Sequence, residues 1–394
     1  MEGHAEAVID LDAVSGNVRA LREHTRGGVM AVVKSDGYGH GMIPAARAAV
    51  AGGADWLAVV RAEEALALRA AGLAAPVLCL MSAADQPHEA AIRAGVDLSA
   101  GTEAMVRQVA AAAAAAGQPA SLHLKVDTGM SRGGATLADW PGVLAAALAA
   151  EAAGQVRITG VWSHLACADI PGHPSIDAQV SAFTAAIAMA GRAGARPRLR
   201  HLANTPATVT LPQTWFDLVR PGGGIFGLAT LPGGAPPWLR PAMTVRAQLI
   251  QVKRVPAGTG VSYGHRYHTS APATLGLVPL GYAEGVPRGA ANLAEVLAGG
   301  RRRRIAGTVC MDQFVLDFGA DPVAEGDEVV LFGPGDEGEP TAQEWADVLG
   351  TISYDIVTRF AARVPRSYRG VAGEDEPGSA GAAGQAPAAP VSPP

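Results

Sequence analysis

Apolar and polar positions alternate regularly from about residue 8 to about residue 230 of this chain. Short apolar runs predict strands at Val29–Lys34, Trp56–Val60, Pro76–Leu80, Val96–Ser99, Leu122–Val126, Ile158–Ser163, Arg198–Leu202 and Asp217–Val219. The alanine-rich stretches between them predict helices at Ile43–Ala51, Ala62–Ala71, Glu89–Ala94, Thr102–Ala116, Leu137–Ala153 and Ile176–Ala190. Such alternation is typical of parallel strands joined by crossover helices.

The number of these units points to a fold class. Roughly eight strand–helix units in about 220 residues suit a TIM (β/α)8 barrel. A doubly wound open sheet is the rival, but no early strand is followed by the glycine fingerprint of dinucleotide-binding folds. We therefore predict an α/β protein with an N-terminal TIM barrel.

The pattern changes after a proline- and glycine-rich link at Pro232–Pro237. Strands then predominate, at Val245–Val255, Ala273–Leu280, Arg304–Val309, Phe314–Phe318 and Glu328–Phe332, with helices near Thr341–Leu349 and Ser353–Ala362. We predict a barrel domain over residues 1–235, including a short N-terminal segment that crosses to a mostly-β domain over residues 236–370. Residues 371–394 are almost all Gly, Ala, Pro, Glu and Ser, and are predicted to be disordered.

Composition narrows the function classes. The chain has 394 residues, 49% of them hydrophobic, and a net charge of −5. A basic footprint for nucleic acid is lacking, and the one basic block, Arg301–Arg304, is better explained as a solvated strand edge. Three widely spaced cysteines indicate neither a disulfide framework nor a zinc site, and no metal is expected. Without a secretory pattern or a membrane-length apolar stretch, a soluble cytoplasmic protein is expected.

Reactive side chains gather at the predicted C-terminal ends of the barrel strands, where TIM-barrel active sites lie. These ends carry Lys34, Lys125 with Asp127, His164, Asn204 with Thr205, and Arg220. An amine between a strand and a glycine-punctuated turn, as at Lys34, can form a Schiff base with an aldehyde cofactor. A solvated strand-end lysine is the simpler explanation for Lys34 alone, and the clustering favours a catalytic role.

A series of segments in chain order resembles one known family, the alanine racemases. The segments are Ala31–Gly41, Lys125–Arg132, Trp162–Asp169, Asn204–Thr205, Val219–Gly222, Val261–Gly264, Gly281–Gly285, Cys310–Gln313 and Thr351–Asp355. The resemblance runs from Asp10 to about Arg369. It implies a pyridoxal 5′-phosphate (PLP) enzyme with a barrel, a β-domain and shared active sites in a head-to-tail homodimer.

The resemblance also implies catalytic roles. Lys34 would hold PLP and then act as one base. Racemisation removes a proton from one face of the substrate and returns it to the other, so a second acid/base is required. Tyr263 from the partner subunit is the implied second group, with His164 and Arg220 as its helpers. Arg220 would also face the pyridine nitrogen and leave it unprotonated, because a guanidinium does not release its proton in a protein.

Further roles are implied for the ligands. The cofactor contacts would be Tyr38, His164, Asn204, Thr205, Arg220, Gly222, Gly223 and Tyr354. The substrate carboxylate would meet Arg132 and the backbone N–H of Met311, with Lys125 carbamylated and bracing Arg132. The entrance would be narrowed by Tyr282, Arg288 and Tyr354. Two departures occur in the cofactor segments: Thr205 stands where many relatives have serine, and Gly223 and Gly224 replace bulkier residues.

The leading functional prediction is interconversion of L- and D-alanine, with D-alanine serving as a peptidoglycan precursor. A racemase of serine or of another amino acid on the same scaffold is the first alternative. A PLP-dependent decarboxylase is disfavoured by Arg220 and Tyr263. A non-catalytic PLP carrier of the single-barrel type is disfavoured by the β-domain that bears Tyr263 and Met311.

Overall fold

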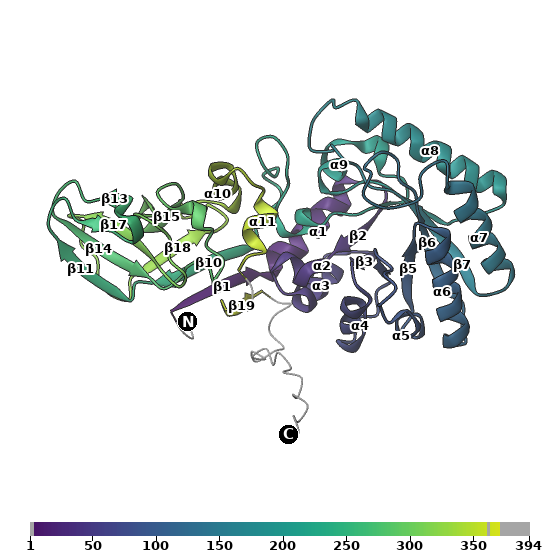
Figure 1. Cartoon of the computed structure of the whole chain (residues 1–394), viewed down its shortest axis with the longest axis horizontal. Coiled ribbons are helices and arrows are strands. Elements are labelled where there is room, and N and C mark those ends of the chain that lie inside the picture. The colour runs from purple at the N-terminus through teal and green to yellow at the C-terminus, as the bar shows by residue number, and fades with distance from the viewer. Residues whose placement is uncertain (1–3, 361–362, 371–394) are drawn as a thin grey trace, which may run out of the picture.

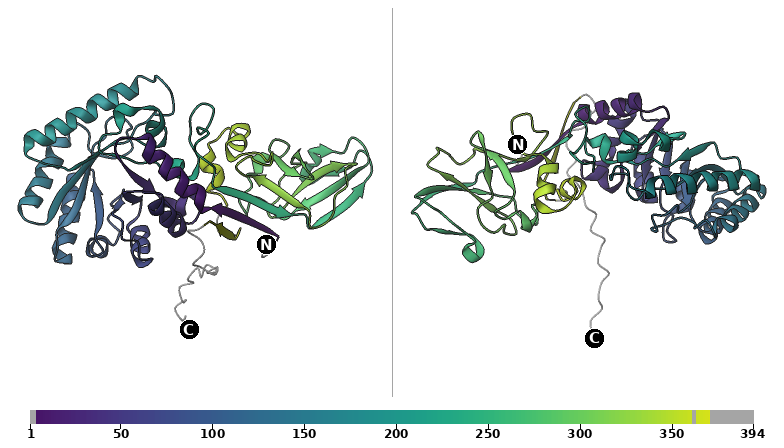
Figure 2. Two further views of the ribbon diagram at one scale, coloured as in Figure 1. Left: turned by 180° about the vertical axis from the view of Figure 1, so that it is seen from behind. Right: turned by 90° about the horizontal axis from the view of Figure 1, so that it is seen from above.

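The chain is described here by a computed structural model that covers residues 4–360 and 363–370. It has two lobes, with helices clustered around a barrel in one and strands in the other (Figures 1 and 2). The tail predicted to be disordered, residues 371–394, lies outside the described residues.

Eight strands close the barrel, which confirms the predicted fold class. They are β2 (Gly28–Val32), β3 (Trp56–Val59), β4 (Val77–Cys79), β5 (Val96–Ala100), β6 (Ala120–Lys125), β7 (Val156–Trp162), β8 (Leu199–His201) and β9 (Leu218–Val219). All neighbouring pairs are parallel, and β9 closes the ring on β2. The helices of this lobe are α1 (Leu11–His24), α3 (Met42–Ala51), α4 (Ala62–Ala70), α5 (His88–Arg93), α6 (Glu103–Ala116), α7 (Trp140–Ala152), α8 (Ser175–Ala193) and α9 (Thr205–Thr210).

Helix ends in the barrel follow local capping chemistry. In α6, the Thr102 hydroxyl accepts a hydrogen bond from Met105 N at 3.1 Å, which satisfies one free N–H of the first turn. Gly117 ends the same helix in the left-handed conformation. Helix α7 begins at Trp140 and not at the predicted Leu137, because residues 137–139 form the turn that precedes it.

The barrel interior is divided into an apolar half and a polar half. Met30, Val32, Ala58, Leu78 and Leu218 form a buried apolar cluster contributed by β2, β3, β4 and β9. The alternate residues of these strands pack against the surrounding helices instead, as the two-residue period of a strand requires. On β5, β6, β7 and β8 the corresponding inward positions carry Asp97, Ser99, His123, Lys125, Trp162 and His201.

The second lobe is built mainly from antiparallel sheet. Its six-stranded sheet has the order β16 (Arg301–Arg304), β15 (Glu295–Ala298), β18 (Glu328–Phe332), β10 (Met243–Gln248), β1 (Ala5–Asp10) and β19 (Arg366–Arg369). A three-stranded sheet contains β11 (Gln251–Val255), β14 (Ala273–Val278) and β17 (Phe314–Gly319), and a two-stranded one contains β12 (Gly260–Val261) and β13 (Tyr267–His268). Two helices complete it, α10 (Ala342–Leu349) and α11 (Ser353–Val357).

The N-terminal strand connects the two lobes. Strand β1 pairs antiparallel with β10 and parallel with β19, after which α1 leads directly into the barrel. Figure 1 shows β1 and β10 side by side between the lobes.

Some predicted elements of this lobe were wrong. The single strand Val245–Val255 is two strands, β10 and β11, which belong to different sheets. The strand Arg304–Val309 lies earlier, at Arg301–Arg304, and the helix Ser353–Ala362 ends at Val357. Strands β1, β12, β13, β15 and β19 and helix α1 were not predicted.

The arginine run lies on an edge strand, as predicted. Arg301 and Arg303 both pair with Asp321, Arg302 pairs with Glu344, and Arg304 lies 3.8 Å from Glu295. Each guanidinium of this run therefore has a carboxylate partner among the described residues.

Candidate active site

Lys34 is presented by an unusual left-handed turn. After β2 and Val33, the segment Lys34–Tyr38 (α2) coils with positive φ at Ser35, Asp36, Gly37 and Tyr38. Three of these four residues are not glycine, and each left-handed residue with a Cβ costs about 1–2 kcal/mol. Strain of this size persists only where the surroundings fix it, and it is concentrated at functional sites.

The contacts around this turn supply that constraint. Glu64 of α4 accepts a hydrogen bond from Ser35 N at 2.8 Å. Asp36 accepts one from Met42 N at 2.9 Å and pairs with Arg366 at 2.6 Å. The Lys34 ammonium lies 5.9 Å from the centre of the Tyr38 ring. Both predicted site residues of this segment are therefore held in one defined turn.

Three hydroxyl-bearing residues converge on the glycine run after β9. The Thr205 hydroxyl oxygen accepts hydrogen bonds from Gly222 N at 3.0 Å and from Gly224 N at 3.1 Å. A Cβ on Gly222 would lie 2.1 Å from the Tyr38 hydroxyl, and one on Gly223 would lie 2.2 Å from the Tyr354 ring. The glycines thus bring bare backbone against all three side chains, forming what we call the hydroxyl cradle (Thr205, Tyr38 and Tyr354 with residues 222–224).

The hydroxyl of Tyr354 is a buried polar group at the centre of the hydroxyl cradle. It is buried and has no hydrogen-bond partner of acceptable geometry among the described residues. Burial raises the pKa of Tyr354 to about 12, although the nearby hydroxyls of Thr205 and Thr230 act in the opposite direction. Burial likewise raises the pKa of Tyr38. Both groups are therefore neutral hydroxyls, able to donate to an anion.

Asn204 caps the helix that follows β8. Its side-chain oxygen accepts a hydrogen bond from Ala207 N at 3.2 Å and caps α9, whose first residue is Thr205. In this chain it fixes the start of the helix that carries Thr205.

Arg220 is buried directly after β9 and forms no ion pair with a carboxylate of the described residues. Its Nη2 donates to the backbone oxygen of Ser163 at 2.7 Å and lies 3.2 Å from His164 Nδ1. Its Nη1 lies 3.1 Å from His201 Nδ1. Burial lowers the pKa of Arg220 to about 9, so it stays charged at neutral pH. Within the described chain, none of its hydrogen bonds uses Nε–H, which is left for a ligand.

The Trp162 ring packs against the cationic side chains of the site. Its ring lies 4.5 Å from Lys125 Nζ and 4.9 Å from the Arg220 guanidinium carbon, which are cation–π distances. Its indole N–H donates to the Ser99 hydroxyl at 2.8 Å, and its ring stacks on His201. Trp162 belongs to the predicted motif Trp162–Asp169, but no role was predicted for its side chain.

The electrostatics of the site are positive. Burial, followed by the charges of Arg132 and Arg220, lowers the pKa of Lys125 to about 8. Burial and then the charge of Arg132 also lower the pKa of Lys34. The pKa of His164 is held well below its usual value by burial and then by the charge of Arg220, which keeps this ring neutral. Such a cluster favours anionic ligands and neutral amines.

Arg132 reaches this cluster from an ordered loop. The Asp127 carboxylate oxygen accepts from the backbone N–H groups of Gly129, Met130 and Ser131 at 2.9, 3.0 and 3.2 Å. The loop is thereby fixed, while the Arg132 side chain itself remains exposed. An exposed cation on a rigid loop is suited to receive a carboxylate from solvent.

The remaining predicted residues are not in the barrel site of the same chain. Tyr263 lies in the 3₁₀ turn η3 (Tyr263–His265) of the β-domain and is 74% exposed. Met311 and Tyr282 are 54% and 44% exposed, and Arg288, in the 3₁₀ turn η4 (Arg288–Ala290), is also exposed. In Figure 1 the β-domain strand β13, which follows η3, lies in the lobe away from the barrel.

These β-domain loops are tied to one another. Thr308 Oγ1 donates to the backbone oxygen of Tyr263 at 2.8 Å, and the Ser262 hydroxyl donates to Thr308 O at 2.6 Å. Tyr282 N donates to the backbone oxygen of Cys310, the residue before Met311, at 3.1 Å. The same Ser262 hydroxyl lies 3.2 Å from the Cys310 sulfur.

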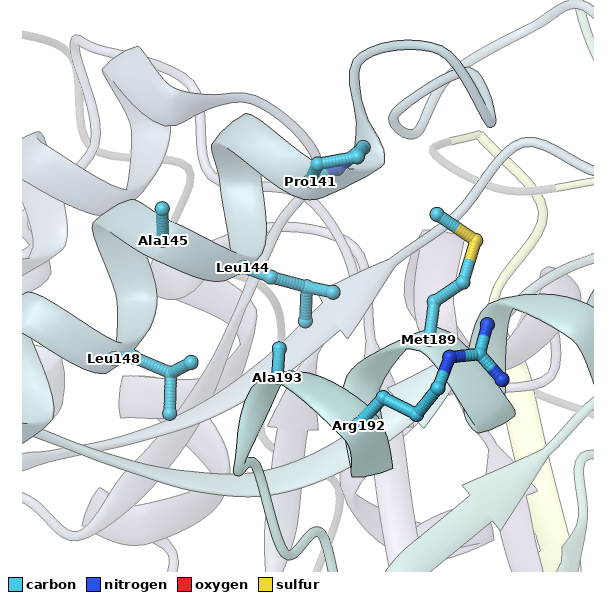
Figure 3. A pocket seen from close by; sticks show the side chains of 7 residues that line it. All are labelled: Pro141, Leu144, Ala145, Leu148, Met189, Arg192 and Ala193. Atoms are coloured by element: carbon cyan, nitrogen blue, oxygen red, sulfur yellow. The ribbon is translucent and has the colours of Figure 1, made fainter.

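The surface groove of the barrel lobe is separate from the predicted site residues. A surface groove between α7 and α8, lined mainly by apolar side chains such as Leu144, Leu148 and Met189, contains none of the predicted site residues (Figure 3). Among residues 4–360 and 363–370, no group of histidine, cysteine and acidic side chains could hold a metal ion. In the same part of the chain, every helix is too short or too polar to cross a bilayer.

The fold and the barrel-end site define an α/β-barrel enzyme with a desolvated lysine and a hydroxyl cradle at the same end of the barrel. Comparison with known proteins identifies its family. Residues 9–230 match the family described as "Alanine racemase, N-terminal domain", and residues 242–368 match "Alanine racemase, C-terminal domain". The chain belongs to the alanine racemase family.

Individual relatives agree over nearly the whole chain. The alanine racemase of Frankia casuarinae is 58% identical over 366 residues, covering 92% of this chain and 95% of that protein. The alanine racemase of Thermobifida fusca is 56% identical over 371 residues, covering 94% and 99%. The crystal structure of alanine racemase from D-cycloserine-producing Streptomyces lavendulae superposes with a TM-score of 0.92 at 51% identity, covering 94% of this chain and 98% of that one.

Proposed function

We propose that the protein is an alanine racemase that interconverts L- and D-alanine with PLP, using Lys34 of one subunit and Tyr263 of its partner. The observation that carries the proposal is the desolvated Lys34 amine on its strained turn, next to the hydroxyl cradle and the Arg220 guanidinium. The 58% identity to the alanine racemase of Frankia casuarinae supports alanine as the substrate.

The residues present fit PLP. Its phosphate would be held by the hydroxyl cradle, where Tyr354 has an unpaired buried hydroxyl and residues 222–224 leave no side chain in the way. A dianionic phosphate is favoured by backbone N–H groups and neutral hydroxyl donors of this kind. When bound, PLP withdraws electrons from the substrate and makes the Cα–H bond acidic.

Lys34 supplies the amine and one base. Its lowered pKa means that a larger fraction of the amine is neutral near pH 7 than for a lysine in water. Only the neutral amine can attack an aldehyde carbon or accept a proton at Nζ. The constrained turn keeps that nitrogen on one side of the site.

Tyr263 of the partner subunit supplies the second proton-transfer group. Its exposed position and fixed backbone suit a side chain that completes a neighbouring site. His164 is neutral and accepts from Arg220 at Nδ1, so its proton is at Nε2. That N–H can stabilise a phenolate oxygen, which a free tyrosine would form only near pH 10.

Arg220 restricts the chemistry. Its free Nε–H can donate to the ring nitrogen of the cofactor but does not transfer the proton. A cofactor ring held by Arg220 in this way would remain unprotonated at its nitrogen and would withdraw electrons less strongly, which would disfavour transamination. Decarboxylation and a carrier function are not favoured by any feature of this site.

Arg132 and Met311 are proposed to orient the substrate carboxylate, with Met311 contributed by the partner. Lys125, with its pKa lowered to about 8, is proposed to react with carbon dioxide. The resulting carbamate would turn a positive group beside Arg132 into a negative one and so hold the guanidinium in place. The shared site requires a homodimer.

Chiral chromatography of the purified protein with added PLP tests the proposal. L-alanine and D-alanine, incubated separately, should both reach a ratio close to one, because the two enantiomers have equal free energy in water. Serine and larger amino acids should react more slowly, since Tyr282 and Tyr354 are proposed to narrow the entrance. Faster racemisation of serine than of alanine would replace the proposal by its first alternative, and no racemisation of any amino acid would refute it.

A further inference from the structure

A chain of hydrogen bonds runs through the polar half of the barrel interior, beneath the site. Arg220 Nη1 lies 3.1 Å from His201 Nδ1. His201 Nε2 lies 2.9 Å from His123 Nδ1, and His123 Nε2 lies 3.2 Å from the Asp97 carboxylate. Arg220 follows the end of β9, whereas Asp97 is near the start of β5, so the chain of bonds runs from one end of the barrel to the other.

The groups at the two ends of this series of hydrogen bonds determine which nitrogen of each histidine carries the proton. A guanidinium only donates hydrogen bonds, so His201 Nδ1 must accept and its proton is at Nε2. That proton is donated to His123 Nδ1, which places the proton of His123 at Nε2 as well. The Asp97 carboxylate then accepts it. Both histidines are neutral and have the same tautomer, and each of the four nitrogen atoms has one partner.

The surrounding residues make room for this arrangement. Both rings are fully buried. Gly160 of β7 faces His123, and a Cβ at that position would lie only 2.4 Å from His123 Nδ1. Trp56 packs edge-on against His123 from the opposite side of the barrel, and Trp162 stacks on His201. The rings therefore cannot rotate to exchange partners without displacing a strand or a tryptophan.

This chain of hydrogen bonds, which we call the relay (Arg220, His201, His123 and Asp97), also explains how a buried cation is tolerated. No carboxylate of the described residues forms an ion pair with Arg220, although leaving a buried charge without compensation is costly. Lys34, Lys125 and Arg132 add further positive charge nearby. The Asp97 carboxylate is the only negative group on this hydrogen-bonded path. It acts on Arg220 through the two neutral imidazoles between them.

We propose that Asp97, His123 and His201 are positioning residues that orient the Arg220 guanidinium toward the cofactor ring and supply its counter-charge across the barrel. The importance of that orientation for catalysis rests on the proposed function, whereas the relay itself does not. None of the three touches the substrate. Their expected effect is on the proton-transfer steps and not on binding of the amino acid.

The tautomers can be measured directly in the PLP-loaded wild-type protein. Long-range proton–nitrogen spectra of deuterated protein with ¹⁵N-labelled histidine rings distinguish Nδ1–H, Nε2–H and doubly protonated rings. His123 and His201 should both be neutral with the proton at Nε2. His40 is a matched internal control, because it is equally buried but its Nδ1 lies 3.0 Å from two backbone oxygens, so it should carry its proton at Nδ1. A charged or Nδ1-protonated His123 or His201 would overturn the relay.

An isosteric variant tests the counter-charge. In Asp97→Asn the amide oxygen still accepts from His123, but the negative charge is lost. The nitrogen and proton signals of both relay histidines should move, more for His123 than for His201. The kcat per bound PLP should fall about five- to tenfold, with the KM for alanine within about twofold, because hydrogen bonds to charged groups are stronger than those to neutral ones.

Asp55→Asn is the matched control, since Asp55 also lies at the start of a barrel strand and accepts from Val29 N and Arg22. It should lower thermal stability while leaving the relay signals and kcat unchanged. Unchanged relay signals or an unchanged kcat in Asp97→Asn would refute the proposed counter-charge. Wild-type protein with the expected tautomers but no racemase activity would instead refute the proposed function and leave the relay standing.

Discussion

Gly223 offers a sharp test of the hydroxyl cradle. The backbone of Gly223 does not have positive φ, so alanine is compatible with its conformation. Space is the obstacle, because the new Cβ would lie 2.2, 2.4 and 2.5 Å from Cε1, Cζ and Oη of Tyr354. Carbon atoms in contact are about 3.5 Å apart or more, so the ring and the turn must separate by about 1.3 Å.

The packing around Tyr354 limits how that shift can be absorbed. Its ring meets Tyr38 edge-on with centroids 5.7 Å apart, and Tyr38 packs against Phe226 at 5.5 Å. Over-packing in such surroundings costs about 1–3 kcal/mol. Since the displaced groups are the proposed phosphate donors, we expect Gly223→Ala to weaken PLP binding by about 5- to 150-fold.

Titration of the apo-protein with PLP, followed by visible absorbance, measures this effect. Gly191→Ala is the control: this helix residue has nothing within 4 Å of its would-be Cβ. It should leave PLP affinity unchanged and stabilise the fold by about 0.5–1 kcal/mol. If Gly223→Ala bound PLP as tightly as the parent, the glycine run would not form the cradle and the phosphate would have to bind elsewhere.

Three further predictions concern the reacting groups. Lys34→Ala should abolish the yellow absorbance of covalently held PLP, and its retention would exclude Lys34 as the attachment site. Lys34→Ala and Tyr263→Phe chains, each inactive, should regain about a quarter of wild-type activity after subunit exchange, since half of the dimers are then mixed and each has one intact site; no recovery would contradict a shared site. ¹³C-labelled bicarbonate at pH 8 should give a carbamate carbonyl signal that is lost in Lys125→Gln, because a pKa of about 8 leaves half of that amine neutral; a persisting signal would place the modification elsewhere.

The barrel could be predicted from sequence because its strands are buried on both sides. Runs such as that of β4 are continuously apolar and are bounded by polar or glycine breaks, which is typical of parallel strands covered by helices. Their predicted and observed ends differ by only one or two residues. The predicted strand bounds were less accurate where the sequence has no apolar pattern, as in β16. Its four residues are all arginine, and ion pairs stabilise it.

The β-domain was harder to predict because sheet membership is a long-range property. Apolar and polar residues alternate over most of the predicted strand Val245–Val255, but two apolar residues stand together at Leu249 and Ile250, where the chain leaves one sheet and enters another. Leu249 N donates to Asp327 O, whereas Ile250 N donates to Leu277 O, on a different sheet. Only the three-dimensional pairing shows this division.

The polar side chains at the strand ends were predicted from the sequence, whereas those deeper in the barrel were not. Residues at strand ends were found through motifs, whereas the relay histidines lie outside those motifs and were not found. A signal was present in β6, where His123 and Lys125 occupy alternate positions between apolar residues that face the helices. Two polar residues at the same face of a buried strand require partners inside the barrel, but the sequence does not say that His201 and Asp97 provide them.

The division of charge and exposure between the lobes supports the proposed shared site. The barrel site supplies cations and neutral amines, whereas Tyr263, the proposed second proton-transfer group, lies in the β-domain. The β-domain exposes Tyr263 on a loop where Ser262 has a φ of 61° and is anchored by its own hydroxyl to Thr308. A strained, hydrogen-bonded loop that exposes a large aromatic side chain is poorly explained as free surface. It is better explained as a preorganised part of a neighbouring subunit's site, which is why activity should depend on dimerisation and not only on folding.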